Sequence, residues 1–469
     1  MKKYIFPLLL SVLSSGLYAQ NTFARFGNNA LLQHANISLM VKDATGNAVV
    51  CRHGERNSMI PASTMKIVTT ATALEILGGD FRFATAVEID GNITREGVLE
   101  GNLIVKGAGD PTLGSDKIGD KAFMEKWIAA VKNAGITKIA GDIIVDPGIF
   151  DSEAVNPKWL WEDIGNYYAS GVYGISYLDN TYQLVLRSGG AGTRPNIVKT
   201  VPELPGLVFE NRLKSTDIAH DSAYIYGAPR SYSRTIQGAI PANRNNFIIK
   251  GDIPEPDILL AKNLQSALIR NHIPVTGNTS NVPPTTRNRR TIHLHRSPPL
   301  REIIREINVK SNNHFAEHLF LTLALQHHAV ATVKDAVATV KRHWQTKGLP
   351  VDELFMCDGS GLSPANAVSA NFLTELLLYM STKSKYKDDF YRSLPLAGKE
   401  GTLASFLKNT RLDGRVRAKS GSMSRVCAYA GYLENDGKQY VFAVIVNNAN
   451  GRSTDVRKKI EALLLDMQP

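Results

Sequence analysis

β-prone segments stand at both ends of this 469-residue chain, and a long stretch of different texture separates them. Near the start, residues 36–41 and 47–51 flank a turn-rich segment, which indicates a hairpin. Near the end, residues 426–433 and 440–447 flank Asn435-Asp436-Gly437, a turn signal between two strands. A closing helix follows. The two ends therefore predict one antiparallel sheet that is built from both termini and covered by helices.

The middle of the chain differs in composition. Residues from about 80 to 280 are rich in glycine, proline, asparagine and short β-prone runs, and only 121–133 and 256–269 are clearly helical there. Helical patterns return at 300–307, 316–328 and 335–346. The chain is also longer than a single core usually serves. We interpret the middle as mostly β material inserted between two halves of an α/β domain.

The first residues have the pattern of a signal peptide. Lys2-Lys3 precedes an apolar run over residues 5–13 that is too short to span a bilayer, and Leu17-Tyr18-Ala19 is a plausible cleavage site. A retained N-terminal anchor is the alternative. The amphipathic stretch 454–467 is interpreted as a core-packed helix rather than a membrane foot. We therefore expect an exported protein with at most peripheral membrane contact.

Charge and cysteine content limit the partners and the redox chemistry. The formal net charge is +11, which could favour a cell-wall polymer, a membrane surface or nucleic acid. No basic run with interleaved aromatic residues stands out, so nucleic acid is not predicted as a partner. Three cysteines, Cys51, Cys357 and Cys427, do not form a disulfide framework, and we expect all three to be buried apolar residues.

The tetrad Ser63-Thr64-Met65-Lys66 is the first candidate for chemistry. It opens a predicted helix over residues 63–77, and residues three apart on a helix share a face, so Lys66 would lie beside Ser63. A lysine can act as a base only if burial or a nearby cation lowers its pKa. Such tetrads arise by chance in many chains, and alone this one is more simply a solvated helix start.

Two further segments change that interpretation. Ser311-Asn312-Asn313 precedes a helical run, where in isolation it could be a helix cap followed by a polar loop. Lys419-Ser420-Gly421-Ser422 lies beside β-prone sequence, where in isolation it could be a polar turn. Ser-x-x-Lys, Ser-Asp-Asn and Lys-Thr-Gly are the signature of β-lactamases and penicillin-binding proteins. Versions of all three occur here in that order, which together indicates a nucleophilic serine.

With these motifs the chain resembles the low-molecular-mass class C penicillin-binding proteins, which are D-alanyl-D-alanine carboxypeptidases and endopeptidases. The resemblance covers nearly the whole mature chain. It includes 61–66, 107–113, 141–146, 310–313, 358–363, 394–398 and 419–422. The long insertion between the first and second motifs is typical of this class and argues against a plain β-lactamase.

The resemblance implies an α/β fold with a β-lactamase/transpeptidase-like domain, an antiparallel sheet covered by helices, and inserted mostly-β domains. The expected segments are 1–19 as signal peptide, 20–86 and 289–469 as the transpeptidase-like domain, 87–175 and 249–288 as inserted domain II, and 176–248 as β-rich domain III. The implied location is the periplasm.

The resemblance also implies catalytic roles. Ser63 would form an acyl-enzyme and Lys66 would take its proton. Ser311 would relay a proton to the leaving amine, and Asn313 would contact the substrate amide. Lys419 would add positive charge and help depress the pKa of Lys66. The backbone N–H groups of Ser63 and of residue 422 would form an oxyanion hole.

The remaining implied residues bind substrate. Lys419 with Ser420, Gly421 and Ser422 would hold the terminal carboxylate of a D-Ala-D-Ala stem; Ser420 stands where threonine is more usual. Asp163 and Tyr168 resemble an inserted segment that approaches the diamino-acid side chain of the stem peptide, and Met423 would line the same pocket.

The expected substrates are peptidoglycan stem peptides and D-Ala cross-links, with β-lactam antibiotics as covalent inhibitors. Neither a metal nor an organic cofactor is expected. Carboxypeptidase and endopeptidase activity use the same acyl-enzyme, so the sequence does not separate them.

Other interpretations stay open at this stage. His314, Glu317 and His318 fit H-x-x-E-H, the inverted zinc-peptidase motif, although no third ligand is evident. A chain of this fold could also be a non-catalytic wall-binding or β-lactam-sensing module. A β-lactamase or esterase on the same scaffold is a further alternative.

Overall fold

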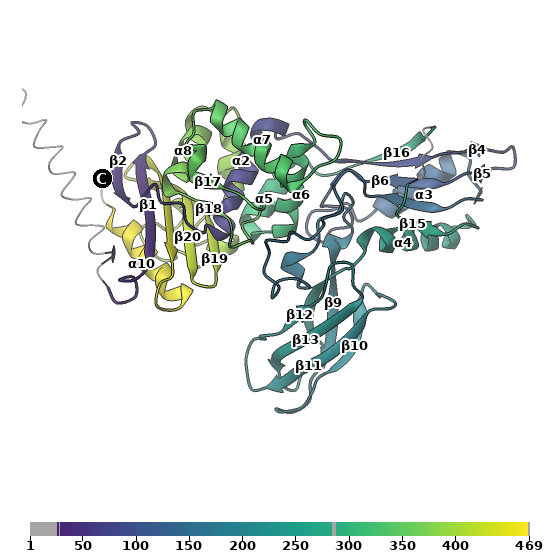
Figure 1. Cartoon of the computed structure of the whole chain (residues 1–469), viewed down its shortest axis with the longest axis horizontal. Helices are drawn as coiled ribbons and strands as arrows, with labels where there is room; N and C mark the ends of the chain where they lie inside the picture. The colour runs from purple at the N-terminus through teal and green to yellow at the C-terminus, as the bar shows by residue number, and fades with distance from the viewer. Residues whose placement is uncertain (1–25, 28, 284–287, 468–469) are drawn as a thin grey trace, which may run out of the picture. The chain divides into compact units, whose positions relative to one another are not determined.

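The structure is a computed structural model that describes residues 26–27, 29–283 and 288–467 (Figure 1). The chain divides into two compact units. The first unit has three segments: the chain up to Asp80, then Leu300–Ala316, and then the chain from Val333 onward. The second unit has two segments, Phe81–Pro299 and Glu317–Thr332. The expected signal peptide lies outside the described residues, and the three nested domains stay a prediction.

One five-stranded antiparallel sheet organises the first unit. Its order is β19-β20-β21-β1-β2, and Asn36 of β1 lies opposite Asn447 of β21. Asp436 and Gly437 have φ of +49° and +75°, which gives the tight turn that their sequence predicts. The predicted sheet from both termini is confirmed. Its strands are β1 Asn36–Asp43, β2 Val49–His53, β19 Val416–Met423, β20 Val426–Asn435 and β21 Lys438–Asn447.

Helices cover both faces of this sheet. Alternate apolar residues of β21 share one core cluster with Val456, Ile460 and Leu463 of α10. Helix α8 contacts β1, β20 and β21 and contributes nothing to that cluster, so it covers the opposite face. The helices of this unit are α2 Met65–Leu77, α5 Leu300–Lys310, α7 Val333–Thr346, α8 Ala370–Thr382, α9 Lys387–Ser393 and α10 Ser453–Asp466. Helix α6 Asn313–Ala324 begins in this unit and continues into the second.

The predicted helices are present, with small differences in their bounds. α6 begins at Asn313 rather than at Ala316, because the Asn312 side chain accepts a hydrogen bond from the Phe315 N–H and acts as a cap. α8 and α9 were not predicted. α2 lies at the centre of the unit: its residues from Met65 to Leu74 are all buried, as expected for a helix that is apolar on every side.

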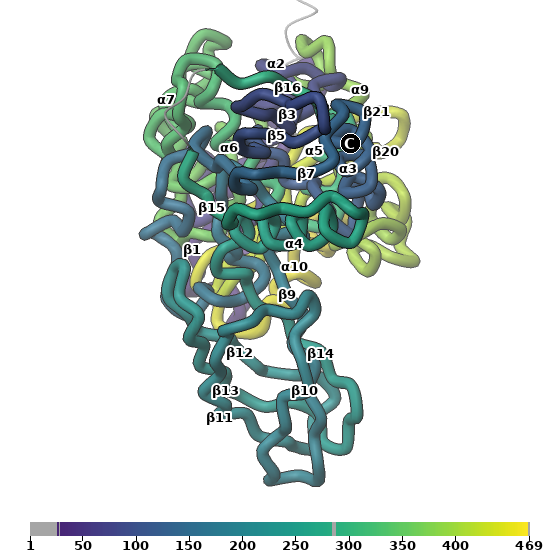
Figure 2. Tube along the Cα trace, turned by 90° about the vertical axis from the view of Figure 1, so that its right-hand side faces the viewer, coloured from purple at the N-terminus to yellow at the C-terminus, as the bar shows by residue number. Residues whose placement is uncertain are grey.

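The second unit contains a mixed sheet of order β15-β8-β6-β3-β16, in which β6 runs parallel to β8. Helix α4 packs on β8 and β15, beside which it runs in Figure 2, and α3 contacts β16. A small sheet of order β4-β5-β7 completes this part. The bounds are β3 Ala84–Ile89, β4 Asn92–Ile93, β5 Val98–Glu100, β6 Leu103–Lys106, α3 Phe123–Asn133, β7 Lys138–Ile139, β8 Ile143–Asp146, α4 Pro256–Arg270, β15 Thr279–Ser280 and β16 Arg290–Arg296.

Residues 181–252 of the second unit are mostly β structure, as their glycine- and proline-rich sequence predicts. Two three-stranded sheets have the orders β10-β9-β14 and β11-β13-β12, and their strands lie together in Figure 2. Their bounds are β9 Thr181–Arg187, β10 Asn196–Val201, β11 Val208–Thr216, β12 Tyr224–Tyr226, β13 Ser233–Pro241 and β14 Phe247–Asp252.

The cysteines differ from the expectation at one position. All three are free thiols; Cys51 and Cys427 are buried, but Cys357 is only partly buried. Cys357 precedes an irregular loop, 358–366, rather than lying in a strand or helix of the core. Among the described residues, no helix has the length and apolar character needed to cross a bilayer.

Candidate active site

Ser63 lies in a short 3-10 turn, Ala62–Thr64, that leads into α2. Ala62 and Thr64 are buried and Ser63 is only partly buried, so the hydroxyl faces an accessible side. Ala62 has φ of +46°, a left-handed conformation that costs a residue with a side chain on the order of 1–3 kcal/mol and clusters at functional sites. The tight turn is what presents Ser63 at the head of the helix.

Lys66 lies one helical turn after Ser63, as the spacing predicts, and its side chain is fully buried. Its Nζ is 2.9 Å from Ser63 Oγ, 2.6 Å from Asn313 Oδ1 and 2.7 Å from the Ser360 carbonyl oxygen. An ammonium has three N–H donors, and three oxygens surround this one. In the neutral amine the two N–H bonds to Asn313 and Ser360 leave the lone pair directed at Ser63 Oγ, which is the geometry of a base.

The Ser360 carbonyl belongs to a loop that the sequence did not mark as functional. The buried Asp358 carboxylate accepts hydrogen bonds from the Gly361 N–H at 2.8 Å, the Ser363 N–H at 2.6 Å and the Asn366 amide at 2.8 Å. The loop is therefore fixed from inside by one acid. The motif 358–363 could have suggested a functional loop, but a backbone acceptor leaves no signal in residue type.

Ser311 and Lys419 form the second pair of the site. Lys419 Nζ donates to Ser311 Oγ at 2.9 Å and to the Ser420 carbonyl oxygen at 2.7 Å. Lys419 is fully buried, and burial, followed by the charge of Lys66, lowers its pKa well below 10.5. Ser311 has φ of +59° between α5 and α6, which places it and Asn313 on either side of a sharp bend. The three motifs thus meet in the first unit.

Residues 419–423 lie inside β19 rather than in a turn, and β19 is an edge strand. On the side of β19 that faces away from β20, the Ala418 N–H donates to the Pro395 carbonyl oxygen, and the Ala397 N–H donates to the Val416 carbonyl oxygen. Beyond that point, no backbone hydrogen bond within the described part of the chain covers the free edge over 420–423. An extended peptide can add to such an edge as a further strand.

Gly421 permits close contact between β19 and the turn before Ser63. A Cβ at this position would lie 2.4 Å from the Pro61 carbonyl oxygen and 3.1 Å from the Ser63 nitrogen, both of them backbone atoms. On the other side, a Cβ on Gly361 would lie 1.9 Å from the Ala62 carbonyl oxygen. The serine turn is held between two glycines that no larger residue could replace without movement.

Gly421→Ala is therefore expected to push β19 away from the serine turn and to lower the free energy of unfolding by about 1–3 kcal/mol. Urea unfolding followed by circular dichroism measures this. Gly46→Ala is the matched control, since a Cβ there meets nothing within 4 Å. Equal stability of the two variants would contradict the close contact.

The predicted residues of the inserted segment lie in the second unit. Tyr168 donates to Asp163 Oδ1 at 3.0 Å, and burial raises the pKa of Asp163. Met423 ends β19 in the first unit and is partly buried. The shared pocket of Asp163, Tyr168 and Met423 stays a prediction.

The H-x-x-E-H motif of the zinc-peptidase interpretation lies in α6. His314, Glu317 and His318 are all buried in α6, as the helical spacing predicts. However, in the described ranges no group of three or more histidine, cysteine, aspartate or glutamate side chains is placed to hold a metal ion.

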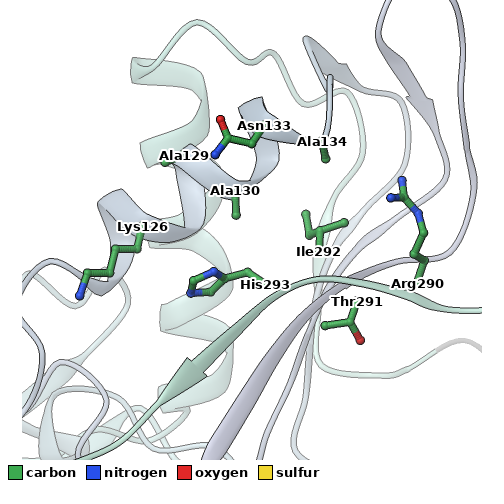
Figure 3. A pocket seen from close by; sticks show the side chains of 9 residues that line it. All are labelled: Lys126, Ala129, Ala130, Asn133, Ala134, Arg290, Thr291, Ile292 and His293. Atoms are coloured by element: carbon green, nitrogen blue, oxygen red, sulfur yellow. The ribbon is translucent and has the colours of Figure 1, made fainter.

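The second unit has a groove of about 520 Å³ (Figure 3). It lies between α3 and the edge strand β16, and its polar lining consists of Lys126, Asn133, Arg290, Thr291 and His293. Lys126 is already paired with Asp120 at 2.6 Å. No predicted site residue lines the groove, and it has no pair of nucleophile and base comparable with Ser63 and Lys66.

Comparisons with known proteins identify the family of the chain. The model of the D-Ala-D-Ala carboxypeptidase 3 (S13) family matches residues 21–467. The chain is 28% identical to the D-alanyl-D-alanine carboxypeptidase of Actinomadura sp. strain R39, over 88% of this chain and 78% of that protein. It is 26% identical to D-alanyl-D-alanine carboxypeptidase DacB of Haemophilus influenzae, over 95% and 94%.

The fold is likewise similar to a solved structure. Penicillin binding protein 4 (dacB) from Haemophilus influenzae superposes with a TM-score of 0.80 at 23% identity, over 95% of this chain and 97% of that one. The same protein has been solved in complex with a β-lactam, with a TM-score of 0.75 at 21% identity.

Proposed function

The chain belongs to the D-Ala-D-Ala carboxypeptidase 3 (S13) family, and we propose that it hydrolyses its substrates through an acyl-enzyme on Ser63. The chain is a serine-type D-Ala-D-Ala carboxypeptidase. One observation above all supports Ser63 as its nucleophile: Lys66 Nζ lies 2.9 Å from Ser63 Oγ, with Asn313 and Ser360 holding its other two positions.

In the first half of the reaction, neutral Lys66 takes the proton of Ser63 while Oγ attacks the carbonyl carbon of the penultimate D-Ala. The backbone N–H groups of Ser63 and Ser422 hold the developing oxyanion; losing one such donor typically costs about 3 kcal/mol. The C–N bond then breaks, and the proton that Lys66 took from Ser63 passes through Ser311 to the leaving amine, which leaves Lys66 neutral again. Ser311 accepts a hydrogen bond from Lys419, which keeps its charge.

In the second half, water attacks the ester carbon. Lys66 takes the proton of the water and returns it to Ser63 Oγ as the bond between Oγ and the ester carbon breaks, which restores the free hydroxyl and neutral Lys66. Before the C–N bond breaks, the carboxylate of the terminal D-amino acid is held by Lys419, Ser420 and Ser422 at the open edge of β19. This assignment of roles follows the order and chemistry of the three motifs.

We propose that the chain cleaves both terminal D-Ala and D-Ala cross-links, since the two reactions differ only in what is attached to the leaving amine. Incubation of the purified protein with a pentapeptide monomer and a cross-linked dimer, followed by mass analysis, tests this. Loss of one D-Ala from the monomer with no cleavage of the dimer would restrict the chain to carboxypeptidase activity.

β-Lactams are proposed as covalent inhibitors of the same serine, because the Haemophilus influenzae protein of similar fold has been solved with one. Asp163 is proposed to pair with the ammonium group of the third stem residue. Asp163→Asn should then raise KM for an amine-bearing stem peptide and leave an acetylated one unaffected; equal effects on both would contradict the pairing.

The proposed location is the periplasm. Fractionation of cells that express the full chain is expected to place it there with its first 19 residues removed. A protein that retains these residues, or stays in the cytoplasm, would contradict the proposal.

The rate of acylation by penicillin is expected to follow a bell-shaped pH profile. Acylation needs Lys66 neutral, so the rate rises as the buried lysine pair loses its first proton. It falls when Lys419 loses its charge, and this fall begins below pH 10.5 because burial lowers the pKa of Lys419.

Stopped-flow acylation across the pH range, with circular dichroism at each pH to follow unfolding, gives this profile. A flat profile, or a decline only above pH 10.5 while the fold is intact, would contradict the assignment of the two lysines.

A further inference from the structure

Two hydroxyl groups of β19 are each bonded to a hydroxyl from another element of the first unit. Ser420 Oγ donates to Thr402 Oγ1 at 2.8 Å, and Ser422 Oγ lies 3.3 Å from Ser453 Oγ, where either atom could be the donor. Thr402 belongs to the 3-10 turn Gly401–Leu403, and Ser453 is the first residue of α10. The pattern repeats at alternate residues of the strand, whose side chains share one face.

A hydroxyl has one proton to donate, and a carboxylate only accepts. In the unliganded arrangement the proton of Ser420 is directed at Thr402, so Ser420 presents only lone pairs elsewhere. To bind a carboxylate, Ser420 must turn this proton onto the ligand. Its oxygen can then accept a hydrogen bond from Thr402, and a chain of two hydroxyls forms in which each bond polarises the next.

We propose that Thr402 and Ser453 are positioning residues that make Ser420 and Ser422 hydrogen-bond donors and so set the preference for a substrate with a free terminal carboxylate. The proposal rests on the proposed function, in which Ser420 and Ser422 contact that carboxylate. Neither Thr402 nor Ser453 needs to touch the substrate. In the complex, Thr402 donates a hydrogen bond to the Ser420 oxygen and Ser453 donates one to the Ser422 oxygen. The proton of each β19 serine is then directed at the carboxylate.

The arrangement selects against a peptide whose terminus is amidated. A terminal amide brings N–H donors of its own, which need acceptors. When Thr402 and Ser453 donate to Ser420 and Ser422, these two serines donate their protons to the ligand. One lone pair of each serine is then already used, so fewer lone pairs remain to accept from an N–H group of the ligand. A methyl ester, which lacks the charge, gains less from each donor than a carboxylate does.

Arg452, the residue before Ser453, does not replace the hydroxyls as a charged partner here. Its guanidinium pairs with Asp455, with Nε 3.1 Å from Oδ2. In the free protein its charge is therefore directed along the first turn of α10. The hydroxyl pairs are the hydrogen bonds by which the side chains of Ser420 and Ser422 contact Thr402 and Ser453.

The experiment compares peptides with and without the carboxylate. In the Ser63→Ala variant, calorimetry gives Kd for an N-acetylated peptide ending in D-Ala-D-Ala and for its C-terminal amide. Thr402→Val and Ser453→Ala are each expected to weaken binding of the acid about threefold to tenfold, as for loss of one hydrogen bond, and to change binding of the amide less than twofold.

Variants that keep the hydroxyl distinguish the loss of a hydrogen bond from a general disturbance of the structure. Thr402→Ser and Ser453→Thr keep the hydroxyl and should restore the Kd of the acid to within about twofold. Ser405→Ala is the control, because the Ser405 hydroxyl accepts a hydrogen bond from Arg457 of α10 and not from a residue of β19. A second measurement is the rate of acylation of the full chain by benzylpenicillin and by its methyl ester, where only the acid should respond.

Equal weakening of acid and amide, or no change in either, would overturn the proposal. So would failure of Thr402→Ser to restore binding of the acid. The binding measurement does not require a reactive Ser63. If the wild-type chain fails to form an acyl-enzyme, the proposed function fails, while the ratio of the two Kd values still decides the role of Thr402 and Ser453.

Discussion

Replacing Ser63 by alanine is expected to abolish covalent labelling by a fluorescent penicillin and to reduce peptide hydrolysis to background. Ser63 is the hydroxyl next to the buried lysine in a turn that leaves it accessible, and no ester can form without it. Gel fluorescence detects the label, and mass analysis of the wild-type digest should find it on the peptide that contains Ser63.

Ser424→Ala is the matched control for this experiment. Ser424 is an exposed serine in the turn after β19, close in sequence to the third motif, and it has no proposed role. Labelling that survives Ser63→Ala, or that disappears with Ser424→Ala, would disprove the assignment of the nucleophile.

Replacing Lys66 by arginine is expected to lower the rate of acylation on the order of 10³-fold, as loss of a general base commonly does. Arginine keeps the positive charge but is not deprotonated in proteins, so it cannot take the proton of Ser63. Lys66→Met, which removes both charge and base, should be about as slow. Stopped-flow acylation measures both, and thermal unfolding verifies that each variant is folded.

Replacing Lys419 by arginine is expected to lower the rate of acylation less than the same replacement at Lys66. The proposed role of Lys419 needs only the charge, so Lys419→Arg should retain a measurable fraction of the rate that Lys419→Met loses. If Lys66→Arg were as active as the wild type, or if arginine were equally inactive at both positions in folded proteins, the division into base and electrostatic partner would be wrong.

The parts of the fold that the sequence predicts are those with a local signal. The hairpin turn at Asp436-Gly437 and the strands beside it follow from turn chemistry and β-prone residues. The position of Lys66 beside Ser63 follows from helical spacing. The meeting of Ser311 and Lys419 with this pair has no local signal, and it was predicted only from the order of three motifs.

The features that were missed have physical reasons. Helix α8 is apolar around most of its surface, because it packs between the sheet and other helices. Its sequence therefore lacks the regular spacing of apolar and polar residues by which a helix is recognised. Ser360 acts through its carbonyl oxygen, which every residue type carries. Ser420 and Ser422 suggest a polar turn in isolation, whereas they form an edge strand because their other edge pairs with β20.

The pairing of Asn36 with Asn447 has a consequence for synthesis of the protein. β1 is made long before its partner β21, and such distant pairings form slowly. Lys419 likewise follows Ser63 by most of the described chain, so Ser63 has no complete catalytic site until β19 has been made. A nascent chain that stops before β19 is therefore expected to be inert, and the serine becomes reactive only after β1 and β21 have paired.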